Sequence, residues 1–225
     1  MTGASDGRRL ARARRPRRDA EANRERILAA AAAVMMREGR HIPLAAIAAE
    51  AGVGVGTLYR KYADRQALLQ ALEYRAYDLL NQILDRLPPG RGVAGREAVR
   101  EFLAGTLEIA DQLVLPLHGA PPLMTAEAVA ARRAISSRLD RLIERGRADG
   151  SITADVNATD VIVFSALVTQ PLANGPDWPT LAARQLAIFV NGLAGEGAAA
   201  LPGPPVTRQD IETAFASGAT GYDER

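Results

Sequence analysis

The sequence predicts an all-α protein with a small N-terminal helical domain and a larger helical domain after it. Apolar residues recur at three- and four-residue spacing, Gly and Pro interrupt these stretches, and no segment alternates polar and apolar residues convincingly. The 225 residues are 48% hydrophobic and 24% charged, the mix of a globular chain that can bury a core. The absence of cysteine excludes disulfides, thiolate zinc sites and cysteine nucleophiles.

Charge is distributed unevenly along the chain. Residues 1–65 hold 14 Arg and Lys against 7 Asp and Glu, whereas residues 66–225 hold 14 against 19. A basic segment beside an acidic remainder is typical of a chain whose one end meets a polyanion.

The first predicted helix follows a basic arm. Residues 1–18 carry seven arginines and one acid with no apolar period, so we expect them to be disordered. Asp19 can cap the helix that follows, and Gly39 can end it in a left-handed conformation. Its apolar stripe consists of Ile27, Ala31, Val34 and Met35.

Two short helices come next. Pro43 suits the start of a helix over 44–51, Gly52 stops it, and a third helix is expected over about 55–62. Ala48 is small enough to let the two helices pack closely. The residues expected in their joint core are Leu44, Ile47, Val53 and Leu58.

A long helix follows, capped by Asp64 and stopped by Pro88-Pro89-Gly90. Its stripe consists of Leu68, Leu72, Ala76, Leu79, Ile83 and Leu87. Further helices are expected near 95–117, 125–148, 158–170 and 178–193. After a Gly/Pro/Ala linker at 195–206, Thr207-x-x-Asp210 resembles a capping box that opens a short helix to about Phe215, packed back on the body.

This reading divides the chain into a disordered arm (1–18), a three-helix domain (19–65), a larger helical domain (66–194) and a C-terminal linker with a short helix (195–225). The arginines before the apolar stretch 27–36 imitate a signal peptide, but acids intervene and no small-residue cleavage site follows. No apolar run approaches the ~18 residues of a membrane span. We therefore expect a soluble, cytoplasmic protein.

Catalytic and metal sites are not expected. The two histidines, His41 and His118, lie far apart in the sequence, and no metal-ligand spacing appears. The glycine run from Gly52 to Gly56 follows a helix rather than a strand, so it does not indicate a nucleotide site. The sequence predicts no enzyme, no metal and no cofactor.

The stretch 44–62 has the layout of a helix-turn-helix, in which the second helix enters the major groove of DNA. At Ile47-Ala48-Ala49-Glu50-Ala51-Gly52-Val53-Gly54-Val55-Gly56-Thr57-Leu58-Tyr59-Arg60-Lys61-Tyr62 the sequence resembles the TetR family of bacterial transcriptional regulators. The resemblance covers about residues 20–70. It implies an N-terminal DNA-binding domain and a helical domain that binds a ligand and dimerises. The function it implies is repression of an operator that a small-molecule effector relieves.

The resemblance also implies roles for individual residues. Val55, Gly56 and Thr57 stand where the family meets base edges, and Tyr59, Lys61 and Arg65 where it meets phosphates. Val55 and Gly56 cannot donate side-chain hydrogen bonds, so we expect the arm to carry much of the affinity. Its arginines nearest the first helix are Arg14, Arg15, Arg17 and Arg18.

The C-terminal helices are candidates for a homodimer interface. Residues 161–168 are apolar nearly all round, too apolar for a helix with one solvent face. The resemblance implies an intersubunit four-helix bundle, and the alternative is burial of both helices within a monomer. The expected interface residues are Val161, Phe164, Leu167, Val168, Leu186, Phe189, Val190 and Leu193. A two-fold dimer would read a pseudo-palindromic operator in double-stranded DNA.

The family's effector site lies among the middle helices. Candidate wall residues near helix breaks are Leu103, Leu107, His118, Met124, Phe164 and Trp178. Two other interpretations stay open at this point. The chain could be a helical small-molecule carrier or enzyme whose N-terminal region only docks other proteins, or an architectural DNA binder without sequence preference.

Overall fold

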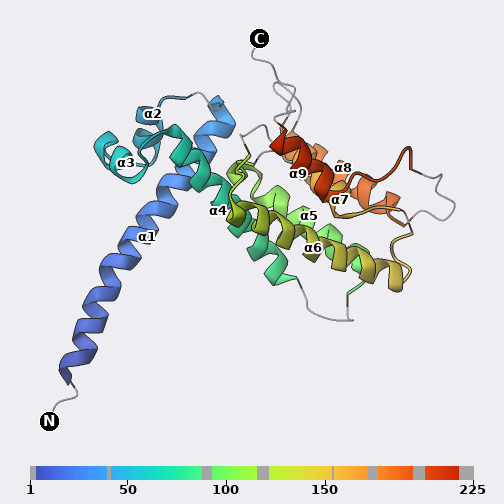
Figure 1. The fold of residues 1–225 in the computed structure, drawn as a ribbon, viewed down its shortest axis with the longest axis horizontal. Helices are drawn as coiled ribbons and strands as arrows, with labels where there is room; N and C mark the ends of the chain where they lie inside the picture. The colour runs from blue at the N-terminus through green and yellow to red at the C-terminus, as the bar shows by residue number, and fades with distance from the viewer. Residues whose placement is uncertain are drawn as a thin grey trace. The chain divides into compact units, whose positions relative to one another are not determined.

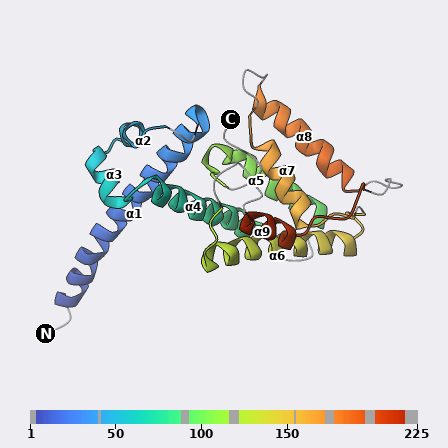
Figure 2. The ribbon, with the colours of Figure 1, turned by 45° about the horizontal axis from the view of Figure 1, so that its top comes forward.

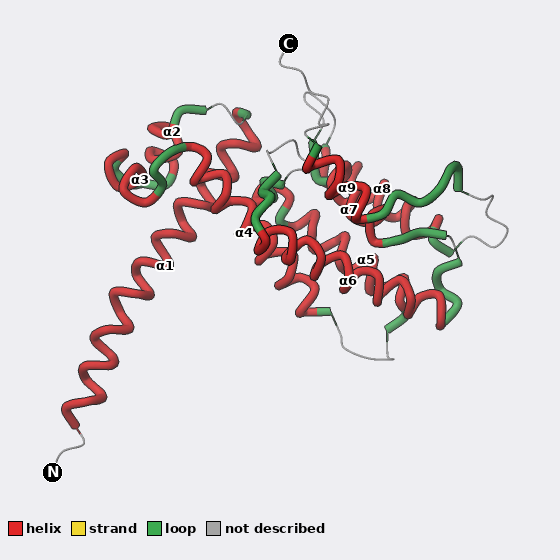
Figure 3. Tube along the Cα trace, viewed as in Figure 1, coloured by secondary structure: helices red, strands yellow, loops and turns green. Residues whose placement is uncertain are grey.

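The computed structural model describes residues 4–39, 42–87, 93–115, 122–153, 155–171, 177–194 and 201–217. All regular structure in these ranges is helical, which confirms the all-α prediction (Figure 3). The chain divides into two compact units, Met1–Leu72 and Glu73–Arg225. The division falls inside one continuous helix, a few residues after the domain boundary that the sequence suggested.

The first unit contains α1 (Ala4–Glu38), α2 (Leu44–Glu50), α3 (Val55–Lys61) and the start of α4 (Arg65–Arg86). Helix α1 packs on α2, and α2 packs on α3. The buried apolar side chains are Ile27, Leu28, Ala31, Ala32, Val34 and Met35 of α1, Leu44, Ile47 and Ala48 of α2, Leu58 of α3, and Leu68 and Leu72 of α4. The predicted stripes therefore form one core, with Val53 only half-buried.

Helix α1 differs from the prediction. It begins at Ala4 rather than Asp19, so the expectation of a disordered arm is wrong for residues 4–18. The added segment contains many arginines and alanines, which are strong helix formers, and extending a helix costs less than nucleating one, but it also includes Pro16, which removes a backbone hydrogen bond from the helix. The first half of α1 extends beyond α2 and α3 (Figures 1 and 2), which explains why it has no apolar stripe.

The turns of this unit follow the predicted caps. Gly39 and Gly52 have φ of 86° and 63°, the left-handed conformation that ends a helix after its last turn. Asp64 Oδ1 accepts the backbone N–H of Ala67 at 2.7 Å and so caps α4. Gly54 is the N-cap of α3 and gives it no side-chain cap.

The second unit continues α4 and adds α5 (Gly95–Glu108), a 3-10 turn (Ala110–Gln112), α6 (Ala126–Ala148), α7 (Ala158–Val168), α8 (Trp178–Gly192) and α9 (Arg208–Ala216). Helix α5 packs against α6, α7 and α8. Fully buried side chains in the core of this unit include Phe102, Leu103, Leu113, Leu139 and Ile143.

The helix expected over 95–117 is shorter than predicted. It ends at Glu108, and the chain then leaves the helical path. Leu113 and Val114, only 1% and 4% exposed, are buried in the extended stretch that follows the 3-10 turn. Burial of these two side chains in extended chain outweighs the local preference for continued helix.

The C-terminal helix α9 lies across α6 (Figure 2). Its predicted capping box is present: Thr207 Oγ1 accepts the N–H of Asp210 at 3.3 Å, and the Asp210 carboxylate accepts the N–H of Thr207 at 2.7 Å. The contacts of α9 with α6, the Arg132–Glu212 pair among them, show that the short helix packs back on the second unit as expected. Among the residues described, none of the helices is both long and apolar enough to span a membrane.

Candidate functional site

Helix α3 presents polar and apolar groups to solvent on one face. Leu58 is completely buried and anchors the helix, whereas Val55 and Tyr59 are 40% and 53% exposed. Gly56 and Lys61 are also exposed, and Thr57 is half-buried. Large apolar side chains exposed on a short, well-anchored helix are a pattern that a partner surface would explain.

Arg60 is an exposed member of this face that the sequence analysis did not single out. Its Nη2 donates to Thr57 Oγ1 at 3.0 Å, one helical turn away. The contact uses one acceptor position of the Thr57 hydroxyl, and the methyl group is the part of this side chain that can make apolar contact. The i, i+3 spacing of the two residues was the available signal.

Lys61 and Arg65, the two cations of α3 and α4 that were predicted to contact phosphates, donate hydrogen bonds to backbone carbonyls of their own unit. Lys61 Nζ donates to Ala20 O of α1 at 3.2 Å, and Arg65 Nη2 donates to Ile42 O. Burial and the nearby Arg24 guanidinium lower the pKa of Lys61. These contacts tie α3 and α4 to α1 and to the segment before α2.

The four arginines of the predicted arm, Arg14, Arg15, Arg17 and Arg18, lie in the first half of α1. The structure therefore places them on a helix that extends beyond the three-helix core (Figure 1).

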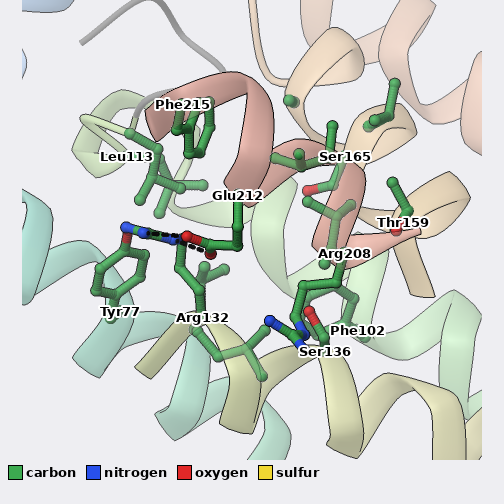
Figure 4. Close-up of a pocket in the computed structure, with 17 residues that line it drawn as sticks. Tyr77, Phe102, Leu113, Arg132, Ser136, Thr159, Ser165, Arg208, Glu212 and Phe215 are labelled. Carbon is green, nitrogen blue, oxygen red and sulfur yellow. Dashed lines mark hydrogen bonds and ion pairs between the residues drawn. The ribbon is translucent and has the colours of Figure 1, made fainter. Parts of the chain in front are cut away.

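The second unit contains a partly open cavity of about 100 Å³ among α4, α5, α6, α7 and α9 (Figure 4). Most of its wall is apolar. Wall residues include Leu80, Phe102, Leu113, Ile135, Ile162 and Phe215. Apolar walls with few polar groups are typical of small-molecule sites.

One polar cluster interrupts this wall. Arg132 donates from Nε and Nη2 to the two carboxylate oxygens of Glu212 at 2.6 and 2.7 Å. Its Nη1 donates to Leu123 O at 2.9 Å, to Glu73 Oε1 at 3.2 Å and to the Tyr77 hydroxyl at 3.2 Å. The guanidinium carbon also lies 5.6 Å from the ring centroid of Phe215.

The cluster changes the ionisation of its members. Burial raises the pKa of Glu73, which is 2% exposed, although the Tyr77 hydroxyl, the Leu123 N–H and Arg132 all stabilise its charged form. Burial and the hydrogen bond to Glu73 raise the pKa of Tyr77. Burial opposes the charge of Arg132, but hydrogen bonds to Glu212 and Tyr77 raise its pKa, so the guanidinium stays charged.

Of the six residues proposed from the sequence for the effector pocket, the five that the structure describes do not line this cavity. Leu103 is fully buried, Leu107 packs against the core and Met124 is 46% exposed. Phe164 stacks on Phe189 with ring centroids 4.1 Å apart, and the Trp178 indole N–H donates to Val168 O at 3.1 Å. His118 lies outside the described residues. The cavity is formed instead by side chains from several helices, α9 included.

The predicted dimer face is also mostly turned inward. Five of its eight residues are buried within the chain, each 7% exposed or less: Val161, Val168, Leu186, Val190 and Leu193. Phe164 and Phe189 are half-buried against each other, and Leu167 is 66% exposed. The exposed large apolar side chains on α7 and α8 are Val163, which also lines the cavity, Leu167 and Ile188. The residues predicted for the interface therefore lie mostly on the inner faces of α7 and α8.

No group of three or more metal-ligating side chains occurs in the part of the chain that the structure describes.

Comparisons with known proteins match both units. Residues 27–72 match the family described as bacterial regulatory proteins, tetR family, and residues 96–195 match the C-terminal domain of SbtR-like transcriptional regulators. A curated relative, the HTH-type transcriptional repressor LfrR of Mycolicibacterium smegmatis, is 32% identical over 101 residues. That match covers 45% of this chain and 52% of LfrR, so the chain spans about half the length of this relative.

Solved structures share the fold over most of the chain. The TetR transcriptional regulator SCO0520 from Streptomyces coelicolor is 31% identical, with a TM-score of 0.52, over 76% of this chain and 97% of that one. The structure of AibR in complex with isovaleryl coenzyme A and operator DNA has a TM-score of 0.59 and 18% identity, over 76% of this chain and 97% of that one. At that identity, the likeness to AibR concerns the fold alone.

Proposed function

The chain belongs to the tetR family of bacterial regulatory proteins, and from this premise we propose that it represses transcription by binding an operator until a small molecule releases it. Both matched families are transcriptional regulators, which argues against the carrier or enzyme interpretation. The observation that carries the proposal is the face of α3, where Val55 and Tyr59 are exposed above the buried Leu58.

We assign recognition of the DNA sequence to the start of α3. Val55, Gly56 and the Thr57 methyl are proposed to contact base edges, with apolar contact to thymine methyl groups as the main interaction. Tyr59 and Arg60, both exposed, are proposed to contact phosphates. Lys61 and Arg65 can serve phosphates only if they exchange or share their contacts to Ala20 O and Ile42 O.

A homodimer is proposed to present two such helices to a pseudo-palindromic site, at least one helical turn (~34 Å) apart. The support is the exposed apolar group Val163, Leu167 and Ile188 on α7 and α8. Exposed apolar side chains gathered on two neighbouring helices favour an interface with a second copy.

The proposed effector site is the cavity of the second unit. A ligand there would shift the DNA-binding equilibrium only by as much as its affinities for the bound and released conformations differ. We place this regulator in the cytoplasm, where its DNA partner is found.

Selection of duplexes from a random pool, followed by fluorescence anisotropy, tests the DNA proposal. We expect the purified dimer to enrich a pseudo-palindrome and to bind it at least 100-fold more tightly than random duplex at moderate salt. Equal affinity for the two duplexes would instead indicate an architectural binder. Absence of binding to either duplex at low salt would refute the proposed function.

A further inference from the structure

Helix α9 supplies one complete wall of the cavity. Arg208, Ile211, Glu212 and Phe215 line it, at spacings that place them on one helical face. All four are half-buried, while the other residues of α9 are exposed. The match to the family's C-terminal domain ends at residue 195, so α9 lies outside it.

Helix α9 is joined to the cavity wall by an ion pair between the Glu212 carboxylate and the Arg132 guanidinium. Glu212 accepts from Nε and Nη2 of Arg132 with both oxygens, the bidentate geometry in which guanidinium recognises a planar carboxylate (Figure 4). Nη1 of Arg132 is held separately by Leu123 O, Glu73 and the Tyr77 hydroxyl. The guanidinium of Arg132 therefore keeps its position if Glu212 moves away.

Charge around the cavity favours an anion once Glu212 is absent. Arg132 would then face the cavity, with Glu73 behind it as the remaining carboxylate among the named lining and partner residues, whereas Arg208 belongs to α9 and leaves with it. The rest of the wall is largely aliphatic, from Leu80, Leu113, Ile135 and Ile162. An occupant that satisfies both parts of the wall carries a carboxylate at one end and an aliphatic chain at the other.

Helix α9 is also weakly held. None of its residues is fully buried, and elements with little buried apolar surface open at low cost. With α9 in place the cavity measures about 100 Å³, below the roughly 300–1,000 Å³ of typical ligand sites. Movement of α9 would enlarge the cavity and remove Glu212 at the same time.

We infer that the effector is an aliphatic monocarboxylate whose carboxylate replaces that of Glu212 on Arg132 and displaces α9. Glu212 is thus an internal competitor that occupies the site in the absence of ligand. This inference rests on the proposed function only in calling the ligand an effector; the carboxylate site itself can be tested without DNA.

Isothermal titration calorimetry on the full chain tests the site. The probes are the straight-chain acids from butanoate to decanoate and their matched primary amides. Glu212→Gln removes the competing charge at nearly constant shape, and Glu144→Gln, at an exposed position on α6, is the control. We expect at least one acid to bind Glu212→Gln at least tenfold more tightly than it binds the wild type or the control, and the amides to show no such gain.

The inference is overturned if no acid of the series gains affinity in Glu212→Gln, or if the amides gain as much. Hydrogen exchange of the α9 amides supplies a second readout: protection should fall in Glu212→Gln and when the acid binds the wild type. Unchanged protection on acid binding would contradict displacement of α9. Acid binding without sequence-specific DNA binding would refute the proposed function and leave the site intact, and the reverse result would refute the site alone.

Discussion

A Cβ atom on Gly95 would lie 2.1 Å from the backbone nitrogen of Gly146, so the start of α5 crosses α6 in direct backbone contact. Gly146 is also tightly packed, because a Cβ there would lie 2.5 Å from Cδ1 of the Ile152 side chain, which follows α6. This crossing fixes the two helices that carry much of the core around the cavity. It leaves no room for a side chain at Gly95.

Gly95→Ala should therefore destabilise the protein although alanine is the better helix former. The added methyl meets backbone atoms that cannot move aside, and overpacking of this kind costs about 1–3 kcal/mol. Urea unfolding followed by circular dichroism measures the loss. Gly192→Ala on α8, where a Cβ meets nothing within 4 Å in the chain, is the matched control and should change stability by less than about 0.5 kcal/mol. Equal midpoints for both variants would argue against the close crossing.

Asp149→Asn should lower the free energy of unfolding at neutral pH and make that free energy fall less steeply as the pH is lowered. Asp149, at the end of α6, accepts the Ser151 N–H at 2.9 Å and the Gly95 N–H at 2.8 Å, so it caps α5 as well. Hydrogen bonds from Ser151 and Gly95 hold the pKa of Asp149 below its ordinary value. The stabilisation is therefore complete above the unfolded pKa of about 3.9 and disappears as the pH falls through the lowered folded pKa.

Urea titrations between pH 2.5 and 7 check this prediction. The difference between Asp149→Asn and wild type should be about 1 kcal/mol or less at pH 7, because the group is solvent-exposed, and should shrink in acid. Asp78→Asn, at an exposed carboxylate on α4, controls for the loss of charge. A difference that stays constant down to pH 2.5 would assign the effect to shape rather than to ionisation.

The first unit could be predicted from sequence because local rules determine it. Gly39, Gly52 and Asp64 act within one turn of their own positions, and the apolar stripes of adjacent short helices have only each other to pack against. The predicted start of α1 was wrong because the helix continues through Pro16, where proline ordinarily ends a helix, and reaches back to Ala4.

The cavity and the outer faces of α7 and α8 could not be predicted in the same way. They depend on which side of each helix faces the core, and a nearly all-apolar helix such as α7 gives no contrast between its sides. Arg132 and Glu212 lie 80 residues apart, and neither stands near a motif. The one available signal was the capping box of α9, which predicted the helix but not its ion pair.

Leu167→Glu should convert the proposed dimer to a monomer. Leu167 is 66% exposed on α7, and a carboxylate there would be desolvated without a counter-charge in a two-fold apolar interface. Sedimentation velocity should give half the mass of the wild type at micromolar concentration. Leu201→Glu, at a 49% exposed leucine outside α7 and α8, should leave the mass unchanged. A monomeric wild type, or a Leu167→Glu variant that remains dimeric, would contradict the interface.

Thr57→Ser and Thr57→Val separate the methyl from the hydroxyl of Thr57. The hydroxyl already accepts Arg60 Nη2, so the methyl is the group proposed to contact thymine. Loss of one apolar methyl contact costs about 0.8 kcal/mol, which is roughly fourfold in affinity. Thr57→Ser should reduce the preference for selected over random duplex by that factor, whereas Thr57→Val should keep it. If Thr57→Val loses the preference instead, the hydroxyl reads the sequence.

Replacement of Arg14, Arg15, Arg17 and Arg18 by glutamine should weaken DNA binding and flatten its salt dependence. Each phosphate contact contributes about 0.9 to the slope of log affinity against log salt, so the slope should fall by up to about 3.6. Glutamine is a good helix former, so the helical backbone of α1 should persist and circular dichroism should not change.

The matched control replaces Arg86, Arg96, Arg133 and Arg141 of the second unit, an equal change in net charge. Because only contacts displace counterions, the control should retain the wild-type slope to within about 0.5. Identical slopes for the two quadruple variants would mean that the basic half of α1 does not touch DNA.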